Sequence, residues 1–450
     1  MHCSRRLTVP KPLRCDEIGR ITGRGDGPHS GRAQCRRRGV LGRSGRKLRF
    51  GRRHIGPVAA LVVGAVLVVG CSSGGSASAP SNVANPSAPT PGNAAPSGSV
   101  ALQASVVSGS TTVSPGEPIT VAAVNGRLGD VQLVSNSGAP IVGTVAGDGS
   151  RWTSSARLGF GTTYTLTANA TGTDAAEVPA TASATFTTVK PRIQTMPYLT
   201  PNDGEVVGVG QPVAVKFDEK ITDKRAAVQA IAISANPKVD GAFYWFNDQE
   251  VRWRPENHWA PGTKVTVEVN TFGRNLGNGT YGQVDRHIAF SIGDEVISSV
   301  DDATKTLSVS MNGAVAKTMP TSMGKNSTPT EHGVFTIGDK HASMMMDSST
   351  FGVPSGAPGG YKTPVKWATR MSYGGVFVHA APWSVDQQGV SNASHGCLNV
   401  STSNAEWFYD HSKRGDLVIV NGTRGSLLGG TEGLGDWNVP WATWKAGGKA

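Results

Sequence analysis

The chain of 450 residues has few cysteines, few aromatic residues and little regular hydrophobic patterning of helical period. Five cysteines are too few to build a disulfide scaffold in a chain of this length. Aromatic residues make up 6% of the sequence, whereas glycine occurs 58 times and proline 27 times, which favours short strands and turns over long helices. The composition therefore predicts a mainly β protein, and the length allows two to four domains.

The excess of positive charge is confined to one end of the chain. The formal net charge is +11, but residues 1–53 contain 16 Lys and Arg against 3 Asp and Glu. Residues 54–450 therefore carry 27 basic and 29 acidic residues, a net charge of −2. A body so close to neutrality offers no general basic surface, so we expect no nucleic-acid partner.

An apolar run follows the basic segment over residues 55–70 and ends at Cys71. It is shorter than the roughly 20 residues that a membrane-spanning helix needs, and a basic segment before such a run is typical of a signal peptide. The sequence Leu67-Val68-Val69-Gly70-Cys71 resembles a bacterial lipobox. This resemblance implies cleavage before Cys71 and a lipid on its sulfur. The alternative is an ordinary signal peptide with an incidental cysteine.

The composition divides the chain into a leader, a linker and folded segments. Residues 1–70 form the basic leader and lipoprotein signal peptide, and 71–100 form a lipidated cysteine with a disordered linker that has no charge. Short β-type runs over 101–190 and 191–293 predict two tandem immunoglobulin-like β-sandwiches. The character changes at residue 294, where a third domain, 294–422, is expected to begin. We expect the lipid to hold the mature chain at the cell membrane, facing the periplasm and cell wall.

Local patterns predict individual elements in the folded segments. Hairpins are expected around turns at 247–248 and 312–313, the second of which is an Asn-Gly pair. A helix is expected over 404–413, where Ser403 and Glu406 have the spacing of a capping box.

Two tryptophans, Trp245 and Trp253, lie on the strands of the first hairpin. Exposed, they would suit sugar binding; buried, they would fill the core. We expect the core role, because alternating aromatic residues on strands usually pack inward.

Cys397 is the only cysteine after residue 71. An exported thiol without a disulfide partner indicates a nucleophile, and a nucleophilic thiol needs a nearby base. His379, at the end of an apolar run, and His395, two residues before the cysteine, are both candidates. Gly396 allows the backbone to turn, so that N–H groups next to Cys397 could form an oxyanion hole. The alternative is an inert buried cysteine flanked by loop histidines.

These residues resemble a known family. Ser394-His395-Gly396-Cys397-Leu398-Asn399 resembles the signature of the L,D-transpeptidases, which have a YkuD-type catalytic domain. Residues 373–383 resemble the family's strand with the general base, and 328–335 resemble a segment near the start of that domain. The order of segments resembles the mycobacterial members. It implies two immunoglobulin-like domains, then a YkuD-type β-rich catalytic domain with a short helix after the nucleophile. A Trp-rich tail, 423–450, would pack on the catalytic domain.

The resemblance also implies a reaction on peptidoglycan stem peptides, which would serve as acyl donor and acceptor. Cys397 would attack the carbonyl of the third residue, diaminopimelate, of a tetrapeptide stem and release the terminal D-Ala. The resulting thioester would pass to the amine of a neighbouring stem and give a 3→3 cross-link. Carbapenem β-lactams would be covalent inhibitors, and no cofactor is implied. An L,D-carboxypeptidase acting on the same stem, or an inactive cell-wall-binding lipoprotein, are the alternatives.

The same resemblance gives roles to residues around the thiol. His379 would be the base, with its second ring nitrogen oriented by the backbone carbonyl of Ala380. The N–H groups of His395, Gly396 and Cys397 would form the oxyanion hole. Substrate-binding roles fall on Tyr361 in a flap over the donor pocket, on the pocket walls Met346 and Trp383, and on Asn399 and Ser394.

Two further patterns point to other chemistry. Ser322 and Lys325 have the S-x-x-K spacing of penicillin-binding proteins, but that motif needs a helix and a K-T-G partner, and neither is indicated here. His379, His395 and Cys397 could in principle bind zinc. No carboxylate that would orient them is evident, so we expect no metal site.

Overall fold

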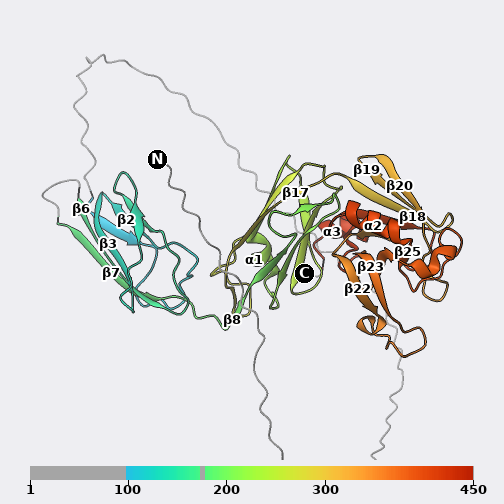
Figure 1. The fold of residues 1–450 in the computed structure, drawn as a ribbon. Coiled ribbons are helices and arrows are strands. Elements are labelled where there is room, and N and C mark those ends of the chain that lie inside the picture. The colour runs from blue at the N-terminus through green and yellow to red at the C-terminus, as the bar shows by residue number, and fades with distance from the viewer. Residues whose placement is uncertain (1–97, 173–177, 449–450) are drawn as a thin grey trace, which may run out of the picture. The chain divides into compact units, whose positions relative to one another are not determined.

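The computed structural model describes residues 98–172 and 178–448 (Figure 1). The predicted leader, Cys71 and nearly all of the predicted linker lie outside the described residues. Strands dominate the described part, which confirms the prediction of a mainly β chain. Within these residues, no helix is both long and apolar enough to span a membrane.

The first sandwich has sheets with the strand orders β1-β2-β5-β4 and β3-β6-β7. In the long strand β6, alternate residues are buried, because successive side chains point to opposite faces. The core between the sheets includes Trp152 and Phe186. The strands are β1 (Ala101–Ala104), β2 (Thr120–Val124), β3 (Gly126–Ser135), β4 (Gly143–Val145), β5 (Arg151–Ser154), β6 (Thr163–Gly172) and β7 (Ala180–Thr187).

The second sandwich has sheets with the orders β10-β17-β15-β12 and β13-β14-β11-β9, and β8 pairs with β16 beside them. The predicted hairpin is present as β13 and β14, and both Trp245 and Trp253 are buried in the core, as predicted. The elements are β8 (Ile193–Thr195), β9 (Pro197–Thr200), β10 (Val206–Val207), β11 (Val213–Phe217), α1 (Lys224–Gln229), β12 (Ile231–Asn236), β13 (Gly241–Trp245), β14 (Glu250–Pro255), β15 (Lys264–Val269), β16 (Thr280–Gly282) and β17 (Arg286–Ile292).

The third part contains one sheet of order β20-β19-β18-β26-β21 and another of order β22-β23-β24-β25. The predicted Asn312-Gly313 turn joins β19 and β20 with positive φ at both residues. The strands are β18 (Val296–Asp301), β19 (Thr306–Met311), β20 (Ala314–Pro320), β21 (Gly333–Thr336), β22 (Lys340–Asp347), β23 (Lys362–Arg370), β24 (Phe377–Ala380), β25 (Leu398–Val400) and β26 (Leu417–Asn421). The helices here are α2 (Thr402–His411), α3 (Trp441–Lys445) and the 3₁₀ helices η1 (Ser348–Phe351), η2 (Pro382–Gln387) and η3 (Asp436–Asn438). The exact limits of the three domains stay predictions.

Helix α2 follows the predicted nucleophile and packs its buried residues Ala405 and Phe408 into the core that contains strands β24 and β25 (Figure 1). The predicted capping box was wrong. The N-cap is Ser401, whose hydroxyl accepts a hydrogen bond from the Asn404 N–H at 3.3 Å. The helix begins two residues earlier than predicted, because Ser401 directly follows β25 in extended conformation and offers the first side-chain cap.

The C-terminal tail, residues 423–448 of the described part, packs on more than the third part of the chain, where the catalytic domain is predicted. Asn438 does bond to that domain, donating to the Val334 carbonyl and accepting from its N–H, both at 2.8 Å. However, the tail also reaches the second sandwich, where the fully buried Asp436 forms an ion pair with the largely buried Arg252 at 2.8 Å. Trp444 is completely buried and donates to the Ala242 carbonyl. The prediction was thus incomplete, since contacts between segments about 200 residues apart leave no local sequence signal.

Candidate active site

Two neighbouring parallel strands bring the predicted base to the predicted nucleophile. β24 carries His379 and β25 begins directly after Cys397, and His379 lies opposite Asn399 in the register. His379 and Asn399 are paired in the register, so their side chains point to the same face of the sheet, and Cys397 lies in the bend just before β25. All three line one pocket of about 180 Å³.

The Cys397 thiol is buried and makes no disulfide. Its Sγ donates a hydrogen bond to the Gly375 carbonyl at 3.4 Å. Burial raises the pKa of Cys397 to about 11, although the Phe377 backbone opposes this shift. The sulfur is therefore a neutral thiol at neutral pH, and it needs a base before it can act as a nucleophile.

His379 is also buried, and its orientation is fixed by the backbone. Its Nδ1 lies 2.9 Å from the Ala380 carbonyl oxygen, the contact that the resemblance implies. Since a carbonyl can only accept, Nδ1 carries the proton and Nε2 is left with a free lone pair. Burial lowers the pKa of His379, while the bond to Ala380 opposes the shift. The imidazole is therefore neutral at pH 7 and can accept a proton.

These two pKa shifts predict an unusual pH profile for the resting thiol. We expect alkylation of Cys397 by iodoacetamide to be slow at pH 7 and to increase continuously to at least pH 10, because thiolate accumulates only near a pKa of about 11. The label on Cys397 is quantified by peptide mass spectrometry, with N-acetylcysteine as the unburied control. A plateau of alkylation below pH 8 would indicate a resting thiolate–imidazolium pair and contradict this assignment.

His395 also lines the pocket, but it is exposed whereas His379 is buried. Its Nε2 is 3.2 Å from Lys325 Nζ, so the imidazole accepts from the ammonium group. Partial burial and the charge of Lys325 lower the pKa of His395. Its ring lies against Tyr361, with 5.1 Å between the centroids. His395 therefore forms part of the pocket wall, where the lone pair of its Nε2 is already used by Lys325.

Tyr361 is hydrogen-bonded to Ser348, the first residue of η1, at the other end of segment 348–361. The Ser348 hydroxyl accepts from the Tyr361 N–H at 2.8 Å, and the Tyr361 carbonyl accepts from the Ser348 N–H at 3.0 Å. The two ends of segment 348–361 are thereby tied together beside the pocket. Burial, and the nearby Cys397, raise the pKa of Tyr361, so its hydroxyl stays protonated.

Ser394 and Gly396 shape the loop 389–397 that leads to Cys397, called the catalytic loop below. The Ser394 hydroxyl donates to the Cys397 carbonyl at 2.7 Å and accepts from the Gly396 N–H at 3.0 Å. Gly396 has φ = +131°, a conformation that side-chain-bearing residues rarely adopt. In this structure the Gly396 N–H is bonded to the Ser394 hydroxyl, and its part in an oxyanion hole stays a prediction. A direct contact of Ser394 with substrate stays a prediction.

The remaining predicted pocket residues lie where the sequence places them. The pocket is lined by Met346, Tyr361, Thr363, Val365, His379, Trp383, Ala393, Ser394, His395, Cys397 and Asn399. Asn399 donates from Nδ2 to the Ser384 hydroxyl at 3.0 Å, while its buried Oδ1 has no hydrogen-bond partner in the described part of the chain. A free buried acceptor in a pocket is suited to a donor on a ligand.

Sequence reasoning noted residues 328–335 only for their resemblance to a family segment and did not show that they support the loop before Cys397. Thr330 donates from its hydroxyl to the Gly396 carbonyl at 2.8 Å, and Thr328 donates to the Ser394 carbonyl at 3.2 Å. Ser322, the serine of the S-x-x-K pattern, is fully buried and donates to the Ser391 carbonyl at 2.8 Å. That resemblance was the one sequence signal near these contacts.

The described residues contain no group of three or more His, Cys, Asp or Glu side chains that could hold a metal ion. The Cys397 thiol donates to the Gly375 carbonyl, and His379 Nδ1 donates to the Ala380 carbonyl. The arrangement fits removal of the thiol proton of Cys397 by a neutral imidazole.

Known protein families match this architecture. The L,D-transpeptidase catalytic domain family (YkuD) matches residues 295–420, and the bacterial Ig domain family (Big_10) matches residues 110–275. L,D-transpeptidase 2 of Mycobacterium tuberculosis is 55% identical over 346 residues, which cover 77% of this chain and 84% of that protein. The chain belongs to the L,D-transpeptidase family. This membership identifies it as an L,D-transpeptidase.

Two further relatives show how far the similarity extends. L,D-transpeptidase 5 of M. tuberculosis is 32% identical over 339 residues, or 74% of this L,D-transpeptidase and 73% of that protein. A solved structure of the L,D-transpeptidase LdtMt1 in complex with imipenem is 38% identical, and it covers 50% of this chain and 97% of its own, with a TM-score of 0.44.

Proposed function

We propose that this L,D-transpeptidase forms 3→3 peptidoglycan cross-links with Cys397 as nucleophile and His379 as general base. One observation carries the proposal: a buried, unpaired thiol and a neutral imidazole with a free Nε2 line one pocket, the imidazole on β24 and the thiol directly before the neighbouring parallel strand β25. A thiol of raised pKa is a poor nucleophile alone, so the reaction depends on the base beside it.

In the first step, His379 Nε2 takes the proton from Cys397 as the sulfur attacks the carbonyl carbon of diaminopimelate in a tetrapeptide stem. A C–S bond forms, and the carbonyl oxygen becomes negatively charged. The C–N bond to the terminal D-Ala then breaks, and His379 gives its proton to the leaving amine. D-Ala leaves, and a thioester stays on Cys397.

In the second step, the side-chain amine of a diaminopimelate on another stem attacks the thioester. A C–N bond forms, the C–S bond breaks, and the amine proton passes through His379 to the sulfur. The enzyme is thereby regenerated, and no cofactor is consumed.

We assign the oxyanion contact to the N–H groups of His395 and Cys397. The third N–H of the motif, that of Gly396, is already bonded to Ser394. Backbone N–H groups on a rigid loop can stabilise the negative charge on the carbonyl oxygen without rearranging during the reaction. A rigid loop conformation therefore lowers the barrier to acylation.

The donor pocket has the features that a stem peptide needs. Met346 and Trp383 give apolar walls, and Tyr361 covers the side formed by segment 348–361. The free Oδ1 of Asn399 would accept a hydrogen bond from a peptide or amine N–H of the donor.

A second groove supports transfer to an acceptor over hydrolysis. It has a volume of about 290 Å³, is mainly apolar, and shares Val365 and Trp383 with the donor pocket. Ala380 and Ser343 also line it. We propose that the acceptor stem reaches the thioester along this groove.

This assignment predicts a selective defect for Ser343→Trp. Ser343 is exposed on β22 and lines the groove, so an indole there would obstruct the acceptor. We expect formation of cross-linked dimer to fall by about tenfold, the order expected for misplacing one reactant, while acylation of Cys397 by the donor is unchanged. Ala342→Trp is the matched control, since Ala342 is exposed on the same strand and does not line the groove. Equal effects of the two variants on dimer formation would exclude this acceptor route.

The proposed reaction is tested by incubating the enzyme with a disaccharide-tetrapeptide and identifying products by mass spectrometry. A dimer that has lost one D-Ala is the expected product. Tripeptide alone would instead show an L,D-carboxypeptidase, and unchanged substrate would favour an inactive cell-wall-binding protein.

We also propose that the enzyme works at the outer side of the cell membrane, held by a lipid on Cys71. The lipobox-like sequence before Cys71 and the uncharged stretch after it support this. Mass spectrometry of the mature N-terminus tests it, and a terminus other than lipidated Cys71 would contradict it.

A further inference from the structure

The catalytic loop 389–397 rests along its length on residues 321–330. The Gly389 N–H donates to the Thr321 carbonyl at one end, and the Ser394 N–H donates to the Met323 carbonyl in the middle, each at 3.0 Å. The Lys325 N–H donates back to the Ser394 carbonyl, also at 3.0 Å. The position of the loop that presents Cys397 is thus set by the position of segment 321–330.

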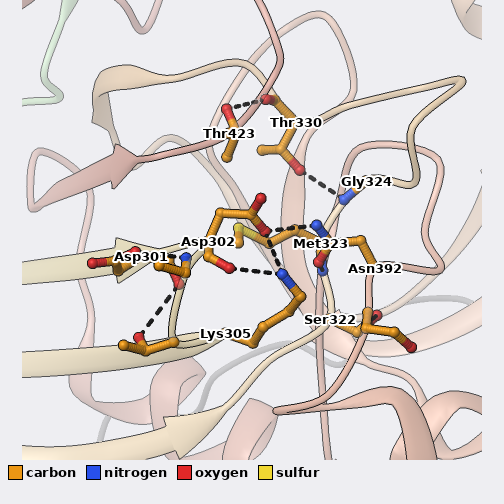
Figure 2. A network of polar contacts seen from close by, with 12 residues as sticks. Asp301, Asp302, Lys305, Ser322, Met323, Gly324, Thr330, Asn392 and Thr423 are labelled. Carbon is orange, nitrogen blue, oxygen red and sulfur yellow. Dashed lines mark hydrogen bonds and ion pairs between the residues drawn. The ribbon is translucent and has the colours of Figure 1, made fainter.

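Asn392, in the loop, links segment 321–330 to Asp302, which follows strand β18 (Figure 2). Its Oδ1 accepts from the Met323 N–H at 3.1 Å, and its Nδ2 donates to Asp302 Oδ1 at 2.6 Å. The Asn392 amide therefore bonds through its oxygen to the supporting segment and through its nitrogen to the Asp302 carboxylate. Such a side chain fixes direction as well as distance.

Asp302 is itself firmly held. It directly follows β18, which pairs with both β19 and β26, and Lys305 Nζ contacts its carboxylate at 2.9 Å and its carbonyl at 2.6 Å. Burial opposes ionisation, but the hydrogen bonds from Asn392 and Lys305 outweigh it and lower the pKa of Asp302. A charged acceptor gives the bond to Asn392 more strength than a neutral one would.

We propose that Asp302 and Asn392 are positioning residues, which hold the catalytic loop in its reactive geometry from the adjoining sheet. The inference rests on the proposed role of Cys397. The route runs from the Asp302 carboxylate through the Asn392 amide to the Met323 backbone, and from the Met323 carbonyl to Ser394, whose hydroxyl is bonded to Cys397 and Gly396. Neither Asp302 nor Asn392 lines the pocket.

A reciprocal exchange of the two side chains tests this in the full chain. Asn392→Asp sets two carboxylates against each other, and we expect kcat for dimer formation to fall about tenfold or more with KM within about threefold. In the double variant Asn392→Asp with Asp302→Asn, the new amide at 302 can donate to the new carboxylate at 392, which still accepts from Met323, while Lys305 keeps its bond to the backbone carbonyl of residue 302. We expect the double variant to recover kcat to within about threefold of wild type.

Two measurements separate positioning from a general loss of stability. The rate of Cys397 acylation by a carbapenem should follow kcat through all variants, while the melting temperature should not. Asp301→Asn is the matched control, because Asp301 caps the same turn at the Ala303 N–H without contacting the loop. If Asn392→Asp does not fold, Asn392→Ala removes both hydrogen bonds without adding charge and carries the same expectation.

The proposal is overturned if Asn392→Asp or Asn392→Ala keeps the wild-type kcat, if the double variant is no better than the poorer single variant, or if losses simply follow the melting temperature. These results leave wild-type acylation of Cys397 intact. Failure of the proposed function would look different, since the wild-type enzyme itself would then give no acyl group on Cys397.

Discussion

Replacing Cys397 with serine is expected to lower the rate of dimer formation by at least about 10³-fold, because a hydroxyl is far harder to deprotonate than a thiol and is a weaker nucleophile. The substitution is nearly isosteric. The new hydroxyl can still donate to the Gly375 carbonyl, so the fold should persist. The measurement is the initial rate of dimer formation from disaccharide-tetrapeptide, together with the adduct mass after incubation with a carbapenem.

An unchanged circular dichroism spectrum and melting temperature provide the control for Cys397→Ser. Cys397 is the only free cysteine among the described residues, so no other described thiol could substitute for it. A Ser variant with more than a few per cent of wild-type activity would refute the thioester mechanism.

Replacing His379 with glutamine is expected to lower the rate of Cys397 acylation by about 10²–10⁴-fold at pH 7, the usual contribution of a positioned base. The defect should shrink as the pH rises, because hydroxide increasingly removes the proton from a thiol of pKa about 11. The measurement is the rate of carbapenem acylation from pH 6 to 10 in both proteins.

His341→Gln serves as the control for the histidine prediction. His341 is partly exposed on β22, where it pairs with Asp339 at 2.9 Å, and it does not line the pocket. Its loss should leave acylation within about twofold of wild type, within the range of ordinary surface substitutions. A ratio of wild-type to His379→Gln rates that stays constant with pH would show that His379 is not the base.

Local sequence signals were sufficient for elements whose causes are local. The Asn312-Gly313 turn was predictable because few residue pairs tolerate positive φ at both positions. Trp245 and Trp253 were predictable as core residues because a strand in a two-sheet sandwich turns alternate side chains toward the other sheet. The contact of His379 with the Ala380 carbonyl was expected from the family resemblance, and it does not depend on the identity of residue 380, because every residue has a backbone carbonyl.

Features that depend on distant partners were not predictable. The tail forms its ion pair through Asp436 with Arg252, and neither residue shows in the sequence which partner it has. The hydrogen bond from the Gly396 N–H to the Ser394 hydroxyl depends on the loop conformation, which the supporting segment 321–330 imposes. Asn392 looks like any loop asparagine until Asp302 is brought to within 2.6 Å of it. The sequence thus indicated the reacting groups, and the structure was needed to find what holds them.

The central claim is that Cys397 carries the acyl group, and the most direct test is to trap that intermediate. The enzyme is incubated with a tetrapeptide donor in the absence of acceptor, quenched in acid and digested for peptide mass spectrometry. The account predicts a tripeptidyl group on the peptide that contains Cys397, bound as a thioester that hydroxylamine removes. Release of D-Ala with Cys397 unmodified, or with the tripeptide on another residue, would contradict it.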